Sequence, residues 1–445
     1  MITPSCELAR VFLEQLPALQ QPFDDLQAAK DMTIADITVG DVLNRGLRGL
    51  PTLLTNVSTV CQDRGLIIRG HELPELVDRQ VLDLTWMGLT GLVPEPDQRD
   101  RFADDLNQLA EIPAGLREVM DALGCEREPI MAFSHSYSYL AVRSAVEDTF
   151  CSSPAGRVRK AVHELEHVKR IVALSLPLIG FINSQLTGQP QRLPIDWRLG
   201  WGVNLCRALN VDERRFGRLL EVYGLAHFDQ GKGNPSSHVS HIVSTTGADP
   251  YRCVAASLIA LSCPSHAFAG VGFLRMLDEI DALYDDPTEA EVCSYLTARL
   301  RNGERIYGVG QAVMKNVDTR FLCLQREAES ALVDDRYYRM MGLILETISD
   351  AFEAAGNRKI VPNPNVNMVS SIILSRLMGV ERAMLPLLFA SSRIIGNLCQ
   401  YIEGMIMPAR VCRPLSFNVD EVRAACRSGE RGRVALSLVA GASRA

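Results

Sequence analysis

The chain has 445 residues, of which 47% are hydrophobic, and a formal net charge of −7. That length can bury a large core and form more than one domain. Lys and Arg are spread along the chain without a basic block, which argues against nucleic acid as a partner. The twelve cysteines show no CxxC pair and no regular spacing, a usage typical of reduced thiols in a cytoplasmic protein.

The N-terminus predicts no targeting segment. It reads MITPSCELARVFLEQL, without a basic start followed by an apolar run, which is against a secretory signal. Acidic residues come early, at Glu7, Glu14, Asp24 and Asp25, which is against a mitochondrial transit peptide. We therefore expect a cytoplasmic location.

Helical patterns dominate the rest of the chain. Strand signals are few, and the two best, Thr33–Val39 and Gly65–Arg69, lie near the N-terminus. The tail from Ser428 to Ala445 is small, basic and alanine-rich, so we expect it to be loosely ordered. Apolar residues at three- and four-residue steps predict helices at Asp100–Ala110, Gly115–Leu123, Val158–Leu174, Asp212–Tyr223, Glu289–Arg301 and Arg336–Ala355.

One segment is long and apolar enough to suggest a membrane span. Cys253–Leu274 contains no Asp, Glu, Lys or Arg. It does contain Pro264 and His266, and acidic residues follow closely after it. A helix that is apolar on every side is also typical of the centre of a large soluble protein, so we predict a buried helix and no membrane partner.

Histidines form two groups. His163 and His167 lie four residues apart on one face of a predicted helix, but the HExxH pattern and a third ligand are absent, so we favour a solvated helix face and predict no metal site. The second group lies between Gly224 and Gly270, in an apolar setting, and contains four of the eight histidines: His227, His238, His241 and His266. Because buried histidines need polar partners, this gathering predicts a functional site.

The second group resembles the citrate synthase family in its eukaryotic form. The matching elements are a His-x-Asp, a Gly-x-Asn turn, Asn-x-Ser-x-His-x-Ser-His and Pro-x-His. Further matches, in the family's order, are RGHELPEL, GVGQAVMKNVDTRFLCLQRE, PNPNVNMVSSIILSRLMGV, SSRIIG and CRPLS. The resemblance implies an all-α homodimer with a large domain (residues 1–265 and 378–445) and an inserted small domain (266–377) closing over a cleft.

The family condenses acetyl-CoA, or another acyl-CoA, with a 2-oxo acid, and the acyl group becomes an alkyl group on transfer. By resemblance Arg320, Arg393 and Arg413 bind the substrate carboxylates, and Arg413 reaches the neighbouring subunit's site. His227 matches the histidine that holds the 2-oxo acid, and His266 the one that polarises the thioester carbonyl. We expect these five side chains to line one cavity.

Two catalytic groups of the family are changed. Gln311 stands where the family has the histidine that protonates the forming alkoxide, and Asn367 stands where it has the aspartate that removes the methyl proton. Gln311 still donates a hydrogen bond but cannot supply a proton by titration. Ala267 and Gly270 are further departures. His238 or Asp229 are candidate replacement bases if they face the cleft.

The resemblance places acyl-CoA on Arg48, Lys315 and the backbone of Val309 and Gly310, with CoA as a substrate and no tightly bound cofactor. The favoured hypothesis is an acyltransferase that uses an unusual 2-oxo acid, for which phosphonopyruvate is one candidate because bidentate arginines suit phosphonate as well as carboxylate. The alternatives are a non-catalytic relative that binds CoA esters or carboxylates, and an enzyme that keeps only part of the chemistry, such as thioester hydrolysis or the reverse cleavage.

Overall fold

The structure is a computed structural model of the whole chain. It falls into two units, Met1–Ala409 and Arg410–Ala445. The residues it describes are 4–27, 53–124, 128–144, 153–231, 233–264, 266–310, 316–356, 362–407, 411–414, 419–420 and 423. The Thr33–Val39 strand and the loosely ordered tail predicted from the sequence lie outside them.

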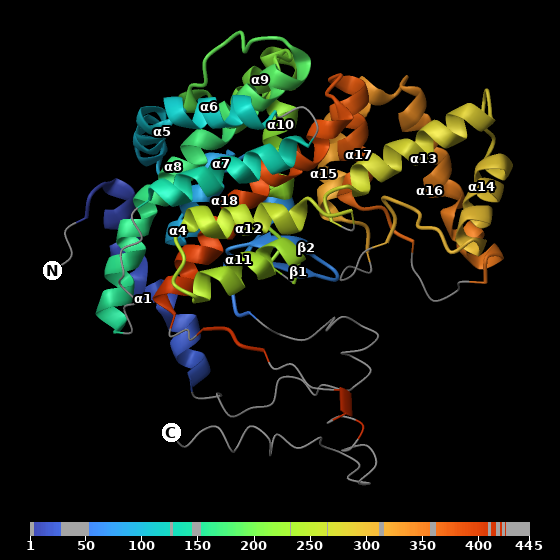
Figure 1. Ribbon diagram of the computed structural model, residues 1–445. Coiled ribbons are helices and arrows are strands. Elements are labelled where there is room, and N and C mark those ends of the chain that lie inside the picture. Colours follow the sequence, from blue (N-terminus) through green and yellow to red (C-terminus); the bar gives the residue numbers. More distant parts are fainter. Residues whose placement is uncertain are drawn as a thin grey trace. The chain divides into compact units, whose positions relative to one another are not determined.

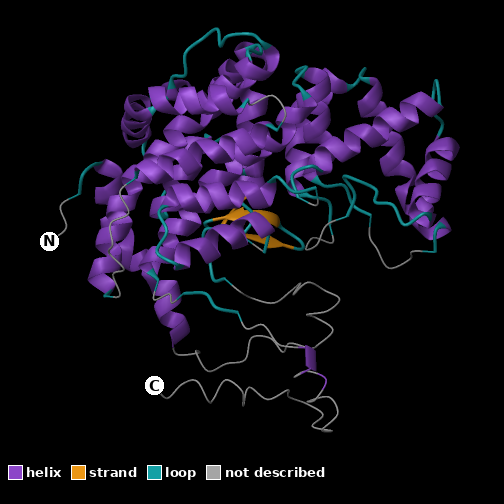
Figure 2. Cartoon of the chain, in the orientation of Figure 1, coloured by secondary structure: helices purple, strands orange, loops and turns teal. Residues whose placement is uncertain are grey.

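The described part of the first unit is almost entirely helical (Figure 2), which confirms the all-α prediction. Its first half contains α1 (Glu7–Gln27), β1 (Ser58–Cys61), β2 (Gly65–Ile68), β3 (His71–Glu72), α3 (Leu73–Leu76), α4 (Val81–Thr90), α5 (Pro96–Leu109), α6 (Ala114–Leu123), α7 (Pro129–Arg143), α8 (Pro154–Thr187), η1 (Trp197–Leu199), α9 (Trp201–Leu209) and α10 (Glu213–His227). Its second half contains α11 (Pro235–Thr245), α12 (Pro250–Leu261), α13 (Ala269–Leu283), α14 (Glu289–Arg301), α15 (Thr319–Leu332), α16 (Arg336–Ala354), α17 (Val366–Ile372), the π-helix η2 (Ile373–Leu377), η3 (Arg382–Met384) and α18 (Leu385–Ile406).

Helix α18 lies at the centre of the core. It packs against α4, α7, α8, α10, α11 and α12, and Figure 1 shows it running among them. Most of its residues are buried, including polar ones such as Ser391, Arg393 and Asn397. A helix surrounded in this way leaves its polar side chains no access to bulk water, so each depends on partners from neighbouring elements.

The small sheet touches the helix that carries Arg320. Its strands are antiparallel in the order β1-β2-β3, and Cys61 pairs with Gly65 at the turn between the first two. Gly65 has φ +72°, and a Cβ there would lie 2.2 Å from the Thr319 hydroxyl oxygen of α15. Glycine is therefore required by both the backbone and the contact. The predicted strand at Gly65–Arg69 is confirmed as β2, which ends one residue earlier.

The predicted helices are found as α5, α6, α8, α10, α14 and α16, with boundaries that move by a few residues except in α8. There, Val158–Leu174 is the first half of a helix of 34 residues. The prediction of one buried helix over Cys253–Leu274 is wrong, because α12 ends at Leu261 and α13 begins at Ala269. Pro264 lies in the break, where its ring cannot continue a helix. No helix in the described ranges is long and apolar enough to cross a membrane.

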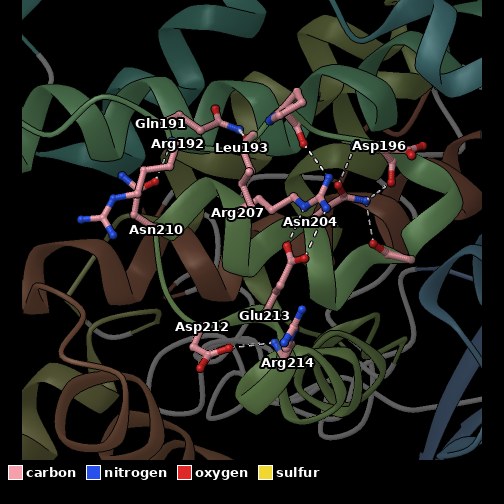
Figure 3. Close-up of polar contacts among 12 residues, drawn as sticks. Gln191, Arg192, Leu193, Asp196, Asn204, Arg207, Asn210, Asp212, Glu213 and Arg214 are labelled. Carbon is pink, nitrogen blue, oxygen red and sulfur yellow. Dashed lines mark hydrogen bonds and ion pairs between the residues drawn. The ribbon is translucent and has the colours of Figure 1, made fainter.

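Polar contacts brace the loop before α9 and the turn into α10 (Figure 3). Arg207 bonds the Glu213 carboxylate, at 2.6 Å from its Nε, and the Pro194 carbonyl at 2.9 Å. Asp212 caps α10 by accepting from the backbone N–H groups of Arg214 and Arg215. These contacts fix where α10 starts, and the same helix ends at His227.

Glu221 of α10 ties two helix starts together. Its carboxylate oxygens accept from the backbone N–H groups of Val81, at the start of α4, and Gly202, at the start of α9, both at 2.6 Å. A Cβ on Gly202 would lie 2.2 Å from the Gly217 carbonyl oxygen, so only glycine allows this approach of α9 to α10. Burial raises the pKa of Glu221 to about 7, although the two N–H groups partly oppose the shift.

Helices α13, α14, α16 and α17 gather at one end of the first unit (Figure 1). Within this group α14 packs on α16, and α13 packs on both α16 and α17. They belong to the segment that the sequence assigns to a small domain, residues 266–377. That domain division, and the homodimer, stay predictions.

Glu221 predicts a pH dependence of folding. Its pKa is higher in the folded chain (about 7) than the ordinary 4.5, so the folded state holds the proton more tightly, and its stability contribution falls as pH rises through this range. At about 1.4 kcal/mol per pKa unit the loss is roughly 3 kcal/mol. Denaturant unfolding at pH 5 and pH 8 should show this loss in the native chain and less of it in Glu221→Gln. Equal pH dependence in the two would contradict the assignment.

Candidate functional site

The predicted site residues lie at helix ends or on the central helix. His227 is the last residue of α10, His266 follows α12, Arg320 is the second residue of α15, Asn367 is the second residue of α17, and Arg393 lies within α18. Three of the helices around the site, α11, α15 and α17, are preceded by an Asn or Asp whose side chain accepts from a backbone N–H two or three residues ahead. Such caps set the helix starts, and with them the site residues.

The Phe389 side chain contacts three of the predicted site residues. Its ring lies edge-on to His227, at 5.1 Å between centroids, and to His266, at 6.3 Å. The Arg393 guanidinium, one turn along α18, has its Cζ 4.9 Å from the centre of the same ring. Three predicted site residues from three separate segments therefore converge on one aromatic side chain.

Arg393 is a buried cation without an anionic hydrogen-bond partner in the described part of the chain. Its side chain is 0% exposed. Nε donates to the His227 carbonyl oxygen at 3.2 Å, while Nη1 and Nη2 are buried and have no partner among the described residues. Burial lowers the pKa of Arg393 to about 10, and the charge of Asp229 partly opposes this. The group stays charged at neutral pH, with up to four N–H donors for an anion.

His227 is neutral and fixed as one tautomer. Its ring stacks on Tyr223 at 4.2 Å, and Nδ1 lies 2.9 Å from the Tyr223 carbonyl oxygen. A carbonyl only accepts, so Nδ1 carries the hydrogen and Nε2 presents a lone pair. Burial lowers the pKa of His227 to about 3, and the charges of Arg320 and Arg393 add to the shift. Nε2 is buried and has no partner in the described ranges.

Arg320 is paired, unlike Arg393. Asp318, the cap of α15, accepts from Arg320 Nε at 2.9 Å and Nη2 at 2.8 Å, and from the backbone N–H of Val366 at 3.2 Å. Both side chains are buried, and Arg320 holds the pKa of the Asp318 carboxyl below its ordinary value despite burial. The Asp318 carboxylate thereby joins the start of α15 to the start of α17.

Asn367 is held in a fixed orientation. Asn365 Oδ1 accepts from the backbone N–H of Asn367 at 3.0 Å and from its Nδ2 at 2.9 Å, while Asn365 Nδ2 donates to the Gly310 carbonyl oxygen at 3.2 Å. The Asn367 side-chain amide therefore directs its nitrogen toward Asn365, and one N–H of that nitrogen remains for another acceptor.

The Val309–Gly310 loop pairs with residues 363–365. Val309 forms an antiparallel bridge with Pro364, and the Gly310 N–H donates to the Asn363 carbonyl oxygen at 2.8 Å. A Cβ on Gly308, whose φ is +79°, would lie 2.2 Å from Met368 Cγ. The loop that the resemblance assigns to CoA is thus built onto the start of α17.

His266 bonds back to the start of α11. Its Nε2 lies 3.2 Å from the Ser236 hydroxyl oxygen. Burial lowers the pKa of His266 to about 4, and the charge of Arg393 adds to the shift. No described residue forms a hydrogen bond to its Nδ1.

The structure does not test the roles of the other predicted site residues. Arg48, Gln311 and Lys315 lie outside the described residues, and Arg413 belongs to the second unit. Their roles, and the single cavity, stay predictions.

Both candidate replacement bases are described. Asp229 is fully buried, with Oδ2 accepting from Ser58 at 2.8 Å and from Gln400 at 2.7 Å. His238 is half-buried on α11. Ala267 follows His266 in the chain. A Cβ added to Gly270 would lie 3.3 Å from the Cβ of Ser371 in α17.

His163 and His167 form no metal centre in the described part of the chain, where no group of three or more candidate ligands gathers. Their rings touch edge-on at 5.4 Å, and His167 bonds the Tyr251 hydroxyl at 3.3 Å.

Sequence reasoning missed the side chains that support the site. Phe389 lies four residues before Arg393, and Tyr223 four before His227, so helical spacing signals both. Asp318 lies two residues before Arg320, in a capping position. Ser236 lies within a quoted motif, but its contact with His266 depends on the packing of α11 against α12.

Comparisons with known proteins show which family the chain resembles. Residues 46–415 match the family described as "Citrate synthase, C-terminal domain". A mitochondrial citrate synthase of Citrus maxima is 26% identical, covering 95% of this chain and 90% of its own length. Citrate synthase 4, mitochondrial, of Arabidopsis thaliana is also 26% identical, covering 93% and 89%.

Solved structures give the same fold. The citrate synthase of Thermotoga maritima has a TM-score of 0.68 at 21% identity and covers 85% of this chain and 96% of its own. That of Thermoplasma acidophilum, in a ternary complex with carboxymethyl coenzyme A and oxaloacetate, has a TM-score of 0.71 at 18% identity and covers 89% and 99%. The fold is therefore the all-α fold of citrate synthases. With the family match over most of its length, the chain belongs to the citrate synthase family.

The two buried arginines predict opposite effects on stability. Arg393→Gln removes an unpaired buried cation, so the free energy of unfolding without ligand should stay within about 1 kcal/mol of the native value or exceed it. Arg320→Gln leaves the Asp318 carboxylate buried without its cation, so we expect a loss of about 3–5 kcal/mol. Denaturant unfolding checks both. An equal loss in both variants would show that Arg393 is structurally paired.

Proposed function

We propose that the chain is an acyltransferase of the citrate synthase type, which condenses an acyl-CoA with an anionic 2-oxo acid. The observation that carries this proposal is Arg393, a buried cation that shares the Phe389 ring with His227 and His266 and whose two terminal nitrogens have no partner among the described residues. A buried charge without a partner is costly, and an anionic substrate that accepts from both nitrogens would relieve that cost. Acetyl-CoA is the proposed acyl donor, with CoA as a substrate rather than a resident cofactor.

The 2-oxo acid would lie between the arginines and His227. A carboxylate on Arg393 would oppose the cation that contributes to the low pKa of His227, and would favour protonation of Nε2. Nε2 would then donate to the bound acid. In this scheme the substrate carboxylate first binds Arg393. Its negative charge then favours protonation of His227 Nε2, which donates a hydrogen bond to the same substrate.

We infer that oxaloacetate is not the best acceptor. Asn367 has no carboxylate for the methyl proton, and Gln311 has no titrating proton for the alkoxide. An acceptor with a more highly charged head group, such as phosphonopyruvate, suits the same arginines. The proposed location is cytoplasmic, whereas the names of the plant relatives describe mitochondrial proteins. The proposed assembly is a homodimer, with Arg413 supplied across its interface.

The test is release of free CoA from acetyl-CoA in the presence of a panel of 2-oxo acids that includes oxaloacetate and phosphonopyruvate. We expect release that requires both substrates and is fastest with an acid other than oxaloacetate. Binding of acetyl-CoA without release for any acid would favour the non-catalytic alternative. Release without any 2-oxo acid would favour simple thioester hydrolysis.

A double substitution tests what limits oxaloacetate turnover. Gln311→His with Asn367→Asp should raise condensation of oxaloacetate with acetyl-CoA at least about a hundredfold, the lower end of one acid–base contribution. The native reaction should slow, because the pocket gains a charge. Asn367→Asp alone should give less, since the alkoxide still lacks its acid.

Circular dichroism and acetyl-CoA binding serve as controls for folding of these variants. If the double variant folds, binds acetyl-CoA and gains nothing, Ala267 and Gly270 become the next positions to change, and the non-catalytic alternative moves ahead.

A further inference from the structure

The start of α11 fixes the hydrogen positions around His266. Asn234 Oδ1 accepts from the backbone N–H of Ser237 at 3.0 Å, and Asn234 Nδ2 donates to the Gln230 carbonyl oxygen at 2.8 Å. A backbone N–H only donates and a carbonyl only accepts, so the two ends of the Asn234 amide cannot be exchanged. The Asn234 oxygen therefore faces Ser236.

The Ser236 hydroxyl lies 2.7 Å from that oxygen. Because Asn234 Oδ1 has no hydrogen, Ser236 must donate its single hydrogen there. Ser236 then has only lone pairs for His266 Nε2, 3.2 Å away. Nε2 must therefore carry the hydrogen, and in neutral His266 the lone pair is on Nδ1.

This tautomer gives His266 a chemistry different from that of a hydrogen-bond donor. A neutral imidazole with the lone pair on Nδ1 cannot donate from Nδ1 to a thioester carbonyl, but it can accept a proton there. The described residues form no hydrogen bond to Nδ1, and Arg393, which contacts the same Phe389 ring, links His266 to the anion site.

We propose that His266 is the general base of the reaction, taking the place of the carboxylate absent at Asn367. This rests on the proposed acyl-CoA condensation. His266 Nδ1 removes a proton from the carbon next to the thioester carbonyl, and the C–H electron pair becomes the enolate. The enolate carbon attacks the ketone carbon of the 2-oxo acid, and the C=O π pair moves to oxygen. The imidazolium then returns the same proton to that alkoxide. Water finally attacks the thioester carbonyl of the condensed product, the C–S bond breaks, and CoA leaves as the thiol.

The proton balance of the condensation closes within His266, so Gln311 is not needed as an acid. The remaining Nδ2 hydrogen of Asn367 offers a neutral donor to the enolate oxygen. The low pKa of His266, about 4, keeps the lone pair available at neutral pH. An anion bound at Arg393 offsets one cause of that low pKa, so His266 becomes a stronger base when the acceptor is in place.

The tautomer is measurable without any activity. In a chain labelled with ¹⁵N-histidine, the His266 signals are assigned by their loss in His266→Gln. We expect an unprotonated, pyridine-like Nδ1 and a protonated Nε2. A protonated Nδ1 would overturn the proposal, whatever reaction the protein catalyses.

The base role is tested with trideuterated acetyl-CoA and the best 2-oxo acid of the panel, by the rate at which one methyl deuterium is lost per condensation (washout), measured as the mass of the product. The deuteron passes through His266 to the alkoxide oxygen and exchanges there with water. His266→Gln keeps an amide nitrogen near the Nε2 position, and His266→Asn keeps one near Nδ1. Neither is a base, so we expect washout to fall at least about a hundredfold in both. If Nδ1 acted as a donor, His266→Asn would retain much of the rate, and washout within tenfold of native would overturn the proposal.

One further variant and the native chain separate the alternatives. Loss of washout in Asp229→Asn with a normal rate in His266→Gln would assign the base to Asp229 and overturn the proposal. Absence of washout and of CoA release in the native chain, with the expected His266 tautomer, would refute the condensation itself and leave the hydrogen positions intact.

Discussion

The site depends on one buried charge, the Arg393 guanidinium in the core, which has no anionic hydrogen-bond partner among the described residues. Asp318 pairs with Arg320, whereas among the described residues Arg393 donates only to the His227 carbonyl oxygen and lies over the Phe389 ring. In the low dielectric of the interior this charge acts strongly on its neighbours. Burial lowers the pKa of both His227 and His266, and the Arg393 charge adds to both shifts, so both imidazoles are neutral. In the proposed function an anionic substrate would relieve the cost of this buried charge, which would favour charged substrates.

Neutral imidazoles matter because the hydrogen-bond network then decides what each ring can do. The Tyr223 carbonyl makes His227 present Nε2, and the Asn234–Ser236 pair makes His266 present Nδ1. Both rings thus offer lone pairs to a site that has lost a carboxylate at position 367. Asn365 holds the Asn367 amide through the same capping contact that begins α17. The geometry at position 367 therefore does not require a negative charge. In the proposed reaction another residue can act as the base.

Much of the fold was predictable from the sequence because helical periodicity is a local property. The six predicted helices and the Gly65 strand were recovered for this reason. The segment Cys253–Leu274 was not, because absence of charge reports burial and does not distinguish one helix from two joined at Pro264. The order of motifs selected candidate site residues, three of which contact Phe389, but could not give their charge or hydrogen-bonding states. Whether Arg393 has a counter-ion, or which nitrogen of His266 carries a hydrogen, depends on contacts between residues far apart in the sequence, such as His266 with Ser236.

The central claim is that Arg393 awaits an anionic 2-oxo acid. Its most direct test is calorimetric titration of the native chain with oxaloacetate and with its dimethyl ester, which has the same carbon skeleton without the two negative charges. We predict saturable binding of the dianion, one per chain, with no detectable binding of the ester and no binding of the dianion to Arg393→Gln. Equal affinity for dianion and ester, or undiminished binding of the dianion to Arg393→Gln, would contradict the claim.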